Sequence, residues 1–402
     1  MAEYHDPIRQ ANYIQQSLSQ DKKPIGIFLS AGCPSAIKIN IDGCESPLIP
    51  GIEGLTKVVC DKLVLSEKKE AIGTVLKHFK TDERGSPNIE DILSHIRILH
   101  QVAGKESVRG LTATELYQLD HDICDTIVTM VKKELPNKDT PYHKVASWIG
   151  AIQRTHPVEI FTTNYDLLME QALEQHRVPY FDGFVGSHHS FFDPYAVEED
   201  LLPSRWARLW KLHGSVNWCQ NDKGVSRSEN NIGQRHVIHP SHLKYEESRR
   251  MPYLAMIDRL RSFFKKPSPI LITCGYSFRD QHLNANLLEG LQGNSTAIIF
   301  ALVHGELKKY PNAIGIASNS ANFNLLAEDE AIVGTKWASW DEKESIDSSS
   351  HQVAVEWVAK DKKTANSPKQ ARFKLGDFVQ FGALLEDLIG ADKQSERQTN
   401  AK

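Results

Sequence analysis

Residues 24–35, PIGIFLSAGCPS, decide the fold of this chain. The apolar, partly β-branched run 24–29 predicts a buried strand, and Ser30-Ala31-Gly32 predicts a tight turn of small residues directly after it. Small residues at such a turn let backbone N–H groups approach a pyrophosphate, which a bulky side chain would hold off. Nucleotide-binding α/β folds begin in this way, although one such turn does not identify a ligand.

Four more segments predict strands, and polar or small residues follow the first three of them. They are residues 158–162 (VEIFT), 208–212 (RLWKL), 269–274 (PILITC) and 297–303 (AIIFALV). Apolar residues at helical spacing precede the last two runs: Tyr253, Ile257, Leu260 and Phe264, then Leu283, Leu287 and Leu288. Because strand and helix alternate, we expect the α/β class, with a Rossmann-like, doubly wound parallel sheet.

The chain outside this pattern predicts two additions to the sheet. Helical periodicity between about 61 and 156 predicts a helical insertion within a domain of residues 1–330. Residues 331–402 form a predicted C-terminal extension, whose apolar segment 373–388 could pack on its own chain or mediate self-association. The polar, glycine-containing stretch 221–235 predicts a surface hairpin or loop, and the polar end, 391–402, is expected to be disordered.

Composition narrows the classes of function. Lys and Arg total 47 against 51 Asp and Glu, so the net charge of -4 provides no global positive field for nucleic acid. The six cysteines include no C-x-x-C pair, which favours a reducing compartment and makes a structural zinc site improbable. No apolar stretch is long enough for a signal peptide or a membrane span, so we expect a cytoplasmic protein without membrane contact.

Polar residues follow several of the predicted strands. Because ligands bind beyond the carboxyl ends of parallel strands, the segments around Gly32, Asn164, His213 and Gly275 should meet at one crevice. Each also has a structural interpretation. His213 could be an ordinary histidine with satisfied hydrogen bonds, Asn164 could cap a helix, and Asp166 could lie in a first helical turn because the helix dipole favours it.

The ordered set SAGCPS (30–35), TTNYD (162–166), LHGS (212–215) and GYSF (275–278) resembles the sirtuin superfamily over roughly residues 24–325. The resemblance implies a sirtuin-like fold that binds NAD+, with the first loop at the diphosphate, TTNYD at the nicotinamide ribose and Gly275 and Ser277 on the adenosine side. The predicted catalytic residues are Asn164, His213 and Asp166. The predicted cofactor-binding residues are Ala31, Gly32, Cys33, Ser35, Thr163, Asn164, Asp166, Gly275, Tyr276, Ser277 and Asp280.

The chemistry that the resemblance implies needs no metal. Cleavage of the nicotinamide-ribose bond develops oxocarbenium character on the ribose while nicotinamide leaves as a neutral molecule. An amide such as that of Asn164 can orient a water or a ribose hydroxyl, and an imidazole can accept a hydroxyl proton. Asp166 could hold a ribose hydroxyl. Asp280 and His282 form only a lone Asp-x-His pattern, which does not predict a metal site, and a ribose contact is the better interpretation of Asp280.

Two departures separate this sequence from the protein-deacylating sirtuins. The four-cysteine zinc ribbon is missing, and Ser30 stands where those enzymes have the first glycine of the loop. The chain is therefore more similar to bacterial sirtuin-like NAD+ hydrolases of anti-phage defence, above all to the subunit that pairs with a HerA-type hexameric ATPase. This implies an NADase that depletes NAD+ when activated, forms a homo-oligomer and meets nucleic acid only through the complex.

Two other functions use the same predicted residues. An NAD-dependent protein deacylase or ADP-ribosyltransferase would use the crevice with a different acceptor, and a non-catalytic nucleotide-binding scaffold would use it for binding only. The basic residues Arg259 and Lys266, with Arg249, Arg250, Arg261 and Lys265, are expected to form the solvated face of a helix and receive no function.

Overall fold

The computed structural model describes residues 4–390 except 42, 84, 222–223, 228–235, 239–250, 344–352 and 360–368. The predictions for residues 391–402, for most of 221–235, and for Arg249 and Arg250 fall outside the described residues.

A ten-stranded sheet forms the centre of the molecule, in the order β1-β17-β16-β15-β14-β13-β2-β5-β9-β6, where the edge strand β6 is Tyr180–Phe181. The five predicted strands are the adjacent members β14, β13, β2, β5 and β9, and each pairs in parallel with its neighbour. Their bounds are Ile298–Leu302 (β14), Ile270–Cys274 (β13), Ile25–Leu29 (β2), Glu159–Thr162 (β5) and Ala207–Lys211 (β9). These results confirm the predicted α/β, Rossmann-like fold class.

The order of the strands reverses beside β2. From β2 the chain continues to β5 and then β9 on one side, and it returns to form β13 and β14 on the other. Leu29 lies opposite both Cys274 of β13 and Thr162 of β5, so the three strands end level with one another. Such a reversal leaves a crevice beyond the carboxyl ends of the strands, where open α/β sheets bind ligands.

Helices cover both faces of the sheet, and alternate residues of each strand enter different hydrophobic cores. Ile27 of β2 packs in the core that includes α1 (Pro7–Ser19), α7 (Pro141–Ala151), α8 (Leu168–Gln175) and α14 (Phe378–Leu388). Its neighbour Phe28 packs in the other core, with α11 (Tyr253–Phe264), α12 (Gln281–Gly293) and α13 (Pro311–Ala317). All five residues of β2 are buried, as the period of two along a strand requires for a central strand covered on both faces.

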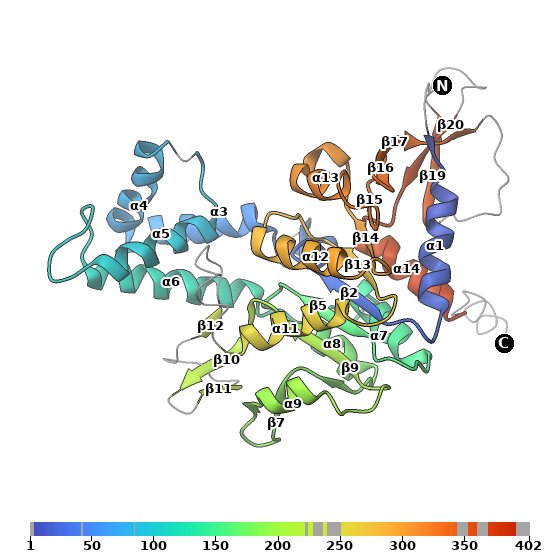
Figure 1. Cartoon of the computed structure of the whole chain (residues 1–402). Coiled ribbons are helices and arrows are strands. Elements are labelled where there is room, and N and C mark those ends of the chain that lie inside the picture. Colours follow the sequence, from blue (N-terminus) through green and yellow to red (C-terminus); the bar gives the residue numbers. More distant parts are fainter. Residues whose placement is uncertain are drawn as a thin grey trace.

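Four helices between β4 (Cys44–Pro47) and α7 project from one side of the sheet (Figure 1). Their bounds are Ile52–Val64 (α3), Lys69–Thr81 (α4), Ile89–Val102 (α5) and Ala113–Val131 (α6). Capping boxes begin two of them: Asn88 with Asp91 at α5, and Thr112 with Glu115 at α6. These helices lie where the helical insertion was predicted, and the division of the chain into domains stays a prediction.

The segment after residue 330 packs closely on the sheet. β16 (Glu330–Val333) and β17 (Lys336–Trp340) extend the sheet beyond β15 (Phe323–Leu326), and β1 (Tyr4–His5) pairs with β17. Helix α14 lies against α7, where the rings of Tyr142 and Phe378 meet edge to face at 5.1 Å. The apolar segment 373–388 therefore packs on its own chain. A three-stranded sheet of β18 (Glu342–Lys343), β20 (Lys369–Phe373) and β19 (Val355–Ala359) completes this region.

A second sheet has five strands, in the order β12-β10-β11-β8-β7, and its strands come from the segments before and after β9. β10 (Gly214–Asn221) and β11 (Gly224–Arg227) pair as an antiparallel hairpin, and the other strands are β7 (Phe184–Val185), β8 (Phe191–Phe192) and β12 (His236–Ile238). His213 occupies the turn between β9 and β10. It therefore lies where the chain passes from the central sheet to the second sheet.

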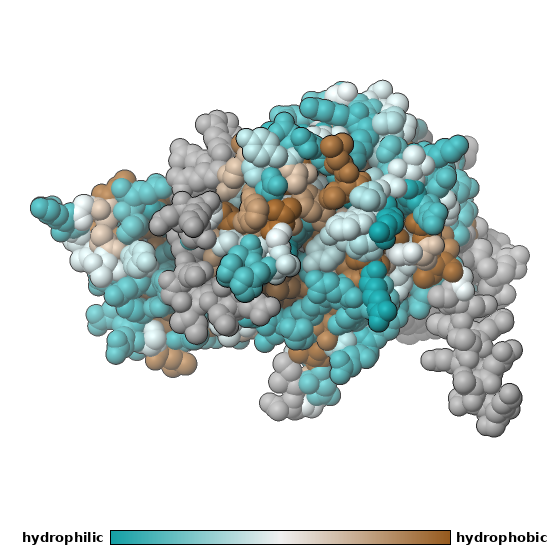
Figure 2. Space-filling view, turned by 90° about the horizontal axis from the view of Figure 1, so that it is seen from below, coloured by the Kyte–Doolittle hydropathy of each residue, from teal (hydrophilic) through white to brown (hydrophobic). Residues whose placement is uncertain are grey.

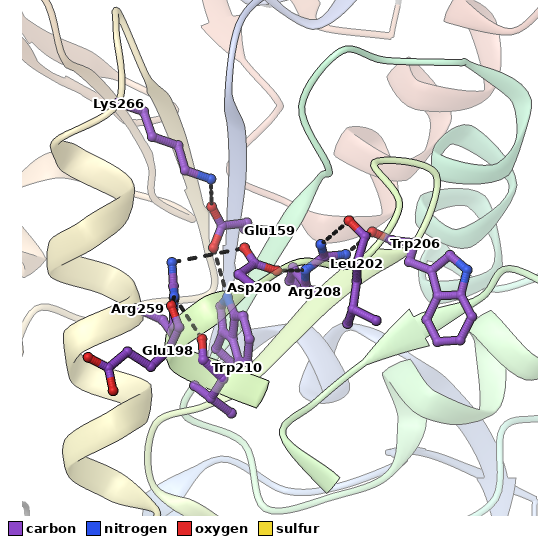
Figure 3. Close-up of polar contacts among 10 residues, drawn as sticks. Glu159, Glu198, Asp200, Leu202, Trp206, Arg208, Trp210, Arg259 and Lys266 are labelled. Carbon is purple, nitrogen blue, oxygen red and sulfur yellow. Dashed lines mark hydrogen bonds and ion pairs between the residues drawn. The ribbon is translucent and has the colours of Figure 1, made fainter. Parts of the chain in front are cut away.

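A buried polar network holds β5 and β9 to α11 at their amino ends (Figure 3). Glu159, which is fully buried, accepts hydrogen bonds from Trp210 Nε1 (2.8 Å) and Lys266 Nζ (2.5 Å). Arg208 is 1% exposed and binds Asp200, while Arg259 donates to the carbonyl of Val197 at 2.8 Å. The expectation that Arg259 and Lys266 belong to a solvated face is therefore wrong, because both cations bind groups of the protein.

On the face shown in Figure 2, hydrophilic residues predominate and apolar residues gather in separate patches, some of them at the end formed by the projecting helices. Leu65, Val102 and Tyr117 are the most exposed large apolar residues of those helices, with exposed fractions of 88%, 64% and 62%. Among the described residues, no helix combines the length and the apolar character that crossing a membrane requires.

Candidate active site

A cavity of about 1440 Å³ lies beyond the carboxyl ends of the central strands. The segments after β2, β5, β9 and β13, which the sequence predicted to meet, all line it. The predicted site residues on its wall are Ala31, Gly32, Ser35, Thr163, Asn164, Asp166, His213, Gly275, Tyr276, Ser277 and Asp280. Cys33 is the exception: it is fully buried, and its Sγ donates to the carbonyl of Cys274 at 3.3 Å. It is a packing residue beneath the loop.

Two glycines bring the turns after β2 and β13 into direct backbone contact. Gly32 N donates to Gly275 O at 3.0 Å. A Cβ built on Gly32 would lie 2.6 Å from the Cα of Gly275, and Gly275 itself has a φ of +67°. A side chain at either position would push the turns apart. Hydrogen bonds also fix the hydroxyl groups near these turns. Ser30 Oγ lies 2.7 Å from Thr163 Oγ1, and Ser35 Oγ donates to Ala31 O at 2.9 Å.

The side chain of Asn164 bridges two of the strand ends. Its Nδ2 donates to the carbonyl of Ser30 at 3.2 Å, and its backbone N donates to Thr162 Oγ1 at 3.0 Å. The N-cap of α8 is Leu167, so Asn164 does not cap that helix. Its amide is oriented by the loop after β2 and lies on the wall of the cavity.

His213 faces a carboxylate from another strand end. Its Nε2 lies 3.2 Å from Asp280 Oδ2, and the two side chains are only 11% and 10% exposed. The other oxygen of Asp280 caps α12 by accepting from the backbone N–H groups of His282 (3.0 Å) and Leu283 (3.1 Å). Because the cap fixes this carboxylate, Asp280 orients the imidazole, and it would pair with an imidazolium formed by proton uptake. The sequence predicted Asp280 as a ribose contact and did not predict this pair.

Two more predicted residues follow β13: the side chain of Tyr276 is buried, and Ser277 is exposed. Tyr276 is 4% exposed and its hydroxyl donates to Asn284 Oδ1 at 2.9 Å, so its side chain packs inward while the residue still borders the cavity. Burial raises the pKa of Tyr276 well above its ordinary value. Ser277 is exposed at the cavity wall. Its hydroxyl is therefore accessible to a ligand.

Asp166 lies beside a buried lysine. Lys211 Nζ donates to the backbone carbonyl of Asp166 and, at 2.8 Å, to Glu170 Oε1. Asp166 Oδ1 accepts from Leu168 N at 3.0 Å, so the side chain supports the start of α8, although Asp166 itself precedes the first helical turn. Burial raises the pKa of the Asp166 carboxyl to about 6, and Lys211 opposes the rise.

This raised pKa predicts that Asp166→Asn stabilises the protein at pH 8 but not at pH 4. In the unfolded chain the carboxyl ionises near its ordinary value of 3.8, whereas in the folded protein it ionises at about 6. Stability is therefore lost as the pH rises between these values and then stays constant. Two units correspond to about 3 kcal/mol of unfolding free energy. Asparagine keeps the oxygen that accepts from Leu168 N.

Urea unfolding at pH 4 and pH 8 measures the effect. Asp61→Asn, at an exposed position of α3, is the control and should leave the pH dependence unchanged. A loss of stability in Asp166→Asn at pH 8 would contradict the burial cost assigned to this carboxylate.

The structure adds cavity residues that sequence reasoning missed. Asn88 and Glu90, at the start of α5, bring the projecting helices to the cavity wall, and Gly376 and Asp377 bring the C-terminal segment to it. Tyr165 also lines the cavity, and burial raises the pKa of its phenol well above the ordinary value. The capping box at Asn88 was a readable signal for the start of α5, but nothing local indicated which surface that end of the helix would meet.

The described residues hold no group of three or more His, Cys, Asp or Glu side chains placed to bind a metal ion. None of the six cysteines, all of which the structure describes, forms a disulfide. Gly32 and Gly275, which lie against each other, both line the cavity. The polar side chains Asn164, His213 and Asp280 belong to residues that line the same cavity.

Comparisons with known proteins match part of the sequence to one family and match solved structures at low identity. Residues 158–325 match the SIR2-like domain family, which is less than half of the chain. No curated protein matches. A Sir2 homologue in complex with NAD matches at 12% identity with a TM-score of 0.36, covering 81% of this chain and 90% of that chain. A second solved structure, of a Sir2 enzyme, matches at 13% identity with a TM-score of 0.34, covering 74% and 86%.

Both structural matches are too distant to carry an argument about the site. The family match includes the segments of Asn164, His213 and Gly275, three of the four strand ends that meet at the cavity. Residues 158–325 of the chain therefore resemble SIR2-like domains in sequence.

Proposed function

We propose that this chain is an NAD+ glycohydrolase that cleaves the nicotinamide-ribose bond to give nicotinamide and ADP-ribose. The observation that carries the proposal is the convergence of Asn164 and the His213–Asp280 pair on one cavity, next to the backbone contact of Gly32 with Gly275. The cavity combines a place for a diphosphate with an oriented amide and a paired imidazole, which are the groups that this reaction needs.

Each residue of the proposed site has a separate role in the reaction. The turn at Gly32 and Gly275 receives the diphosphate, and Asn164, held by Ser30, orients the attacking water or a ribose hydroxyl. The C–N bond breaks with both electrons leaving on neutral nicotinamide, and the water oxygen bonds to the anomeric carbon. His213 accepts the proton that is released, and Asp280 stabilises the imidazolium that results. Asp166 supports the loop that carries Asn164 through its bond to Leu168.

The biological setting is part of the proposal and rests on the resemblance of the four motifs. In that setting the chain acts in anti-phage defence by depleting NAD+, forms a homo-oligomer and becomes active with a HerA-type hexameric ATPase. Regulation of this kind is chemically sensible because unrestrained NAD+ cleavage would kill the cell. Constitutive, rapid turnover by the isolated chain would contradict this part of the proposal.

Two other functions remain distinguishable from hydrolysis. A protein deacylase or ADP-ribosyltransferase would use the same cavity but would release nicotinamide only when an acceptor is present. A nucleotide-binding scaffold would bind NAD+ without cleaving it. The orientation of Asn164 and the pairing of His213 with Asp280 favour catalysis over simple binding, because each places a reactive group in a fixed position.

The deciding experiment measures nicotinamide and ADP-ribose released from NAD+ by the chain, alone and with the ATPase, with and without an acetyl-lysine peptide. We expect release without peptide, and a loss of at least about 100-fold in Asn164→Ala. Nicotinamide that appears only with the peptide would favour deacylation. NAD+ binding without release in every condition would favour the scaffold.

A further inference from the structure

The C-terminal segment forms one end of the cavity. Gly376, Asp377 and Phe378 line it together with Val303 and His304, which follow β14. Residues 376–378 lie outside the region that matches SIR2-like domains, whereas Val303 and His304 lie inside it. Residues 376–378 therefore add a wall to the cavity that the matched region does not supply.

This wall is held in place by close packing. A Cβ on Gly376 would lie 2.1 Å from the carbonyl oxygen of Val303, so the segment lies directly on the end of β14. Phe378 is 2% exposed and packs edge to face on Tyr142 of α7. The position of Asp377 is thus fixed from both sides, by β14 and by α7.

The order of the strands indicates which half of a dinucleotide meets this wall. The proposed diphosphate position lies between β2 and β13, and the reactive groups Asn164 and His213 follow β5 and β9 on one side of it. β14 lies on the other side, next to β13. A dinucleotide whose nicotinamide ribose reaches Asn164 and His213 must direct its adenosine half toward β14 and the C-terminal segment.

We propose that Asp377 makes the cavity selective for a dinucleotide whose adenosine ribose carries a free 2′-hydroxyl, and therefore for NAD+ over NADP+. The inference rests on the proposed function for the class of ligand. A carboxylate accepts hydrogen bonds from a ribose diol, whereas it repels the dianionic 2′-phosphate. Asp377 lies at the end of the cavity to which the adenosine ribose is directed.

The structure offers a substitution that removes the charge and keeps the fold. Asp377 Oδ1 accepts from Val379 N at 2.9 Å and so caps α14. Asparagine caps a helix about as well as aspartate, so Asp377→Asn should preserve α14. Once the carboxylate is neutralised, the positive end of the helix dipole would favour a nearby phosphate. Asp193, which caps α9 (Pro194–Glu199) in the same way and lies outside the cavity, provides a matched control.

The test is calorimetric binding of ADP-ribose and of 2′-phospho-ADP-ribose at pH 8. We expect the unaltered chain to bind ADP-ribose at least about 10-fold more tightly, because like charges in a confined site repel. In Asp377→Asn the preference should fall at least about 10-fold, mainly through tighter binding of the 2′-phosphate ligand. Asp193→Asn should keep the original preference, and thermal unfolding should show that both variants are folded.

The outcomes separate this inference from the proposed function. An unchanged preference in folded Asp377→Asn, or equal binding of the two ligands by the unaltered chain, would overturn the inference alone. Failure of both ligands to bind would overturn it together with the proposed NAD+ site. A shifted preference would support it even in a chain that does not hydrolyse NAD+.

Discussion

His213→Ala is expected to lower kcat for nicotinamide release by about 100- to 10,000-fold, the range for loss of a general acid–base group. The Kd for ADP-ribose should change by only a few fold, because His213 acts on the proton and the diphosphate turn at Gly32 and Gly275 is untouched. Single-turnover release of nicotinamide, measured beside calorimetric binding, separates these two quantities.

Asp280→Asn tests whether the carboxylate that faces His213 contributes to kcat. Asparagine retains an oxygen for the N–H groups of His282 and Leu283, so α12 stays capped while the charge facing His213 Nε2 is lost. We expect a decrease in kcat of about 10-fold, smaller than that of His213→Ala, since the base remains but its imidazolium is no longer paired. His188→Ala, at a position outside the cavity, is the control. Full turnover in His213→Ala would favour the scaffold function.

The largest expected effect on stability is that of Glu159→Ala, at about 3–5 kcal/mol of unfolding free energy. The substitution leaves Trp210 Nε1 without an acceptor in the core and deprives Lys266 of its carboxylate (Figure 3). Removing one partner of a buried ion pair lowers the free energy of unfolding more than replacing both partners by apolar groups does. The reason is that the remaining charged group stays desolvated without its partner. Urea unfolding at pH 7 measures the difference.

Two comparisons make this prediction specific. Glu159→Gln keeps an acceptor for Trp210 and should lose less stability than Glu159→Ala. Glu356→Ala breaks an exposed pair with Lys374, whose side chains are 51% and 31% exposed, and should cost less than about 1 kcal/mol. Glu159 lies at the amino end of β5 and Asn164 lies beyond its carboxyl end, so folded Glu159→Ala should bind ADP-ribose normally. Equal losses in Glu159→Ala and Glu356→Ala would contradict the importance of burial here.

The central strands could be predicted from the sequence because their signal is local. PIGIFL is apolar at every position and PILITC at every position but Thr273, and a strand covered on both faces needs such a run. The same reasoning placed Asn164, His213 and Gly275 at one site, because the carboxyl ends of parallel strands must lie along one edge of the sheet. Cys33, predicted among the cofactor-binding residues, is buried beneath the loop and does not line the cavity, because a loop residue's side chain can point inward as well as outward.

The sequence by itself thus determined the parallel sheet and the residue types at its carboxyl edge. Both follow from short apolar segments and the polar or small residues directly after them. Only the tertiary structure decided which partners these residues have. Asp280 meets His213, Lys266 meets Glu159, and Gly376 meets Val303, although each pair is distant along the chain. Local periodicity shows which face of an element is buried, but the packing of the elements determines what that face contacts.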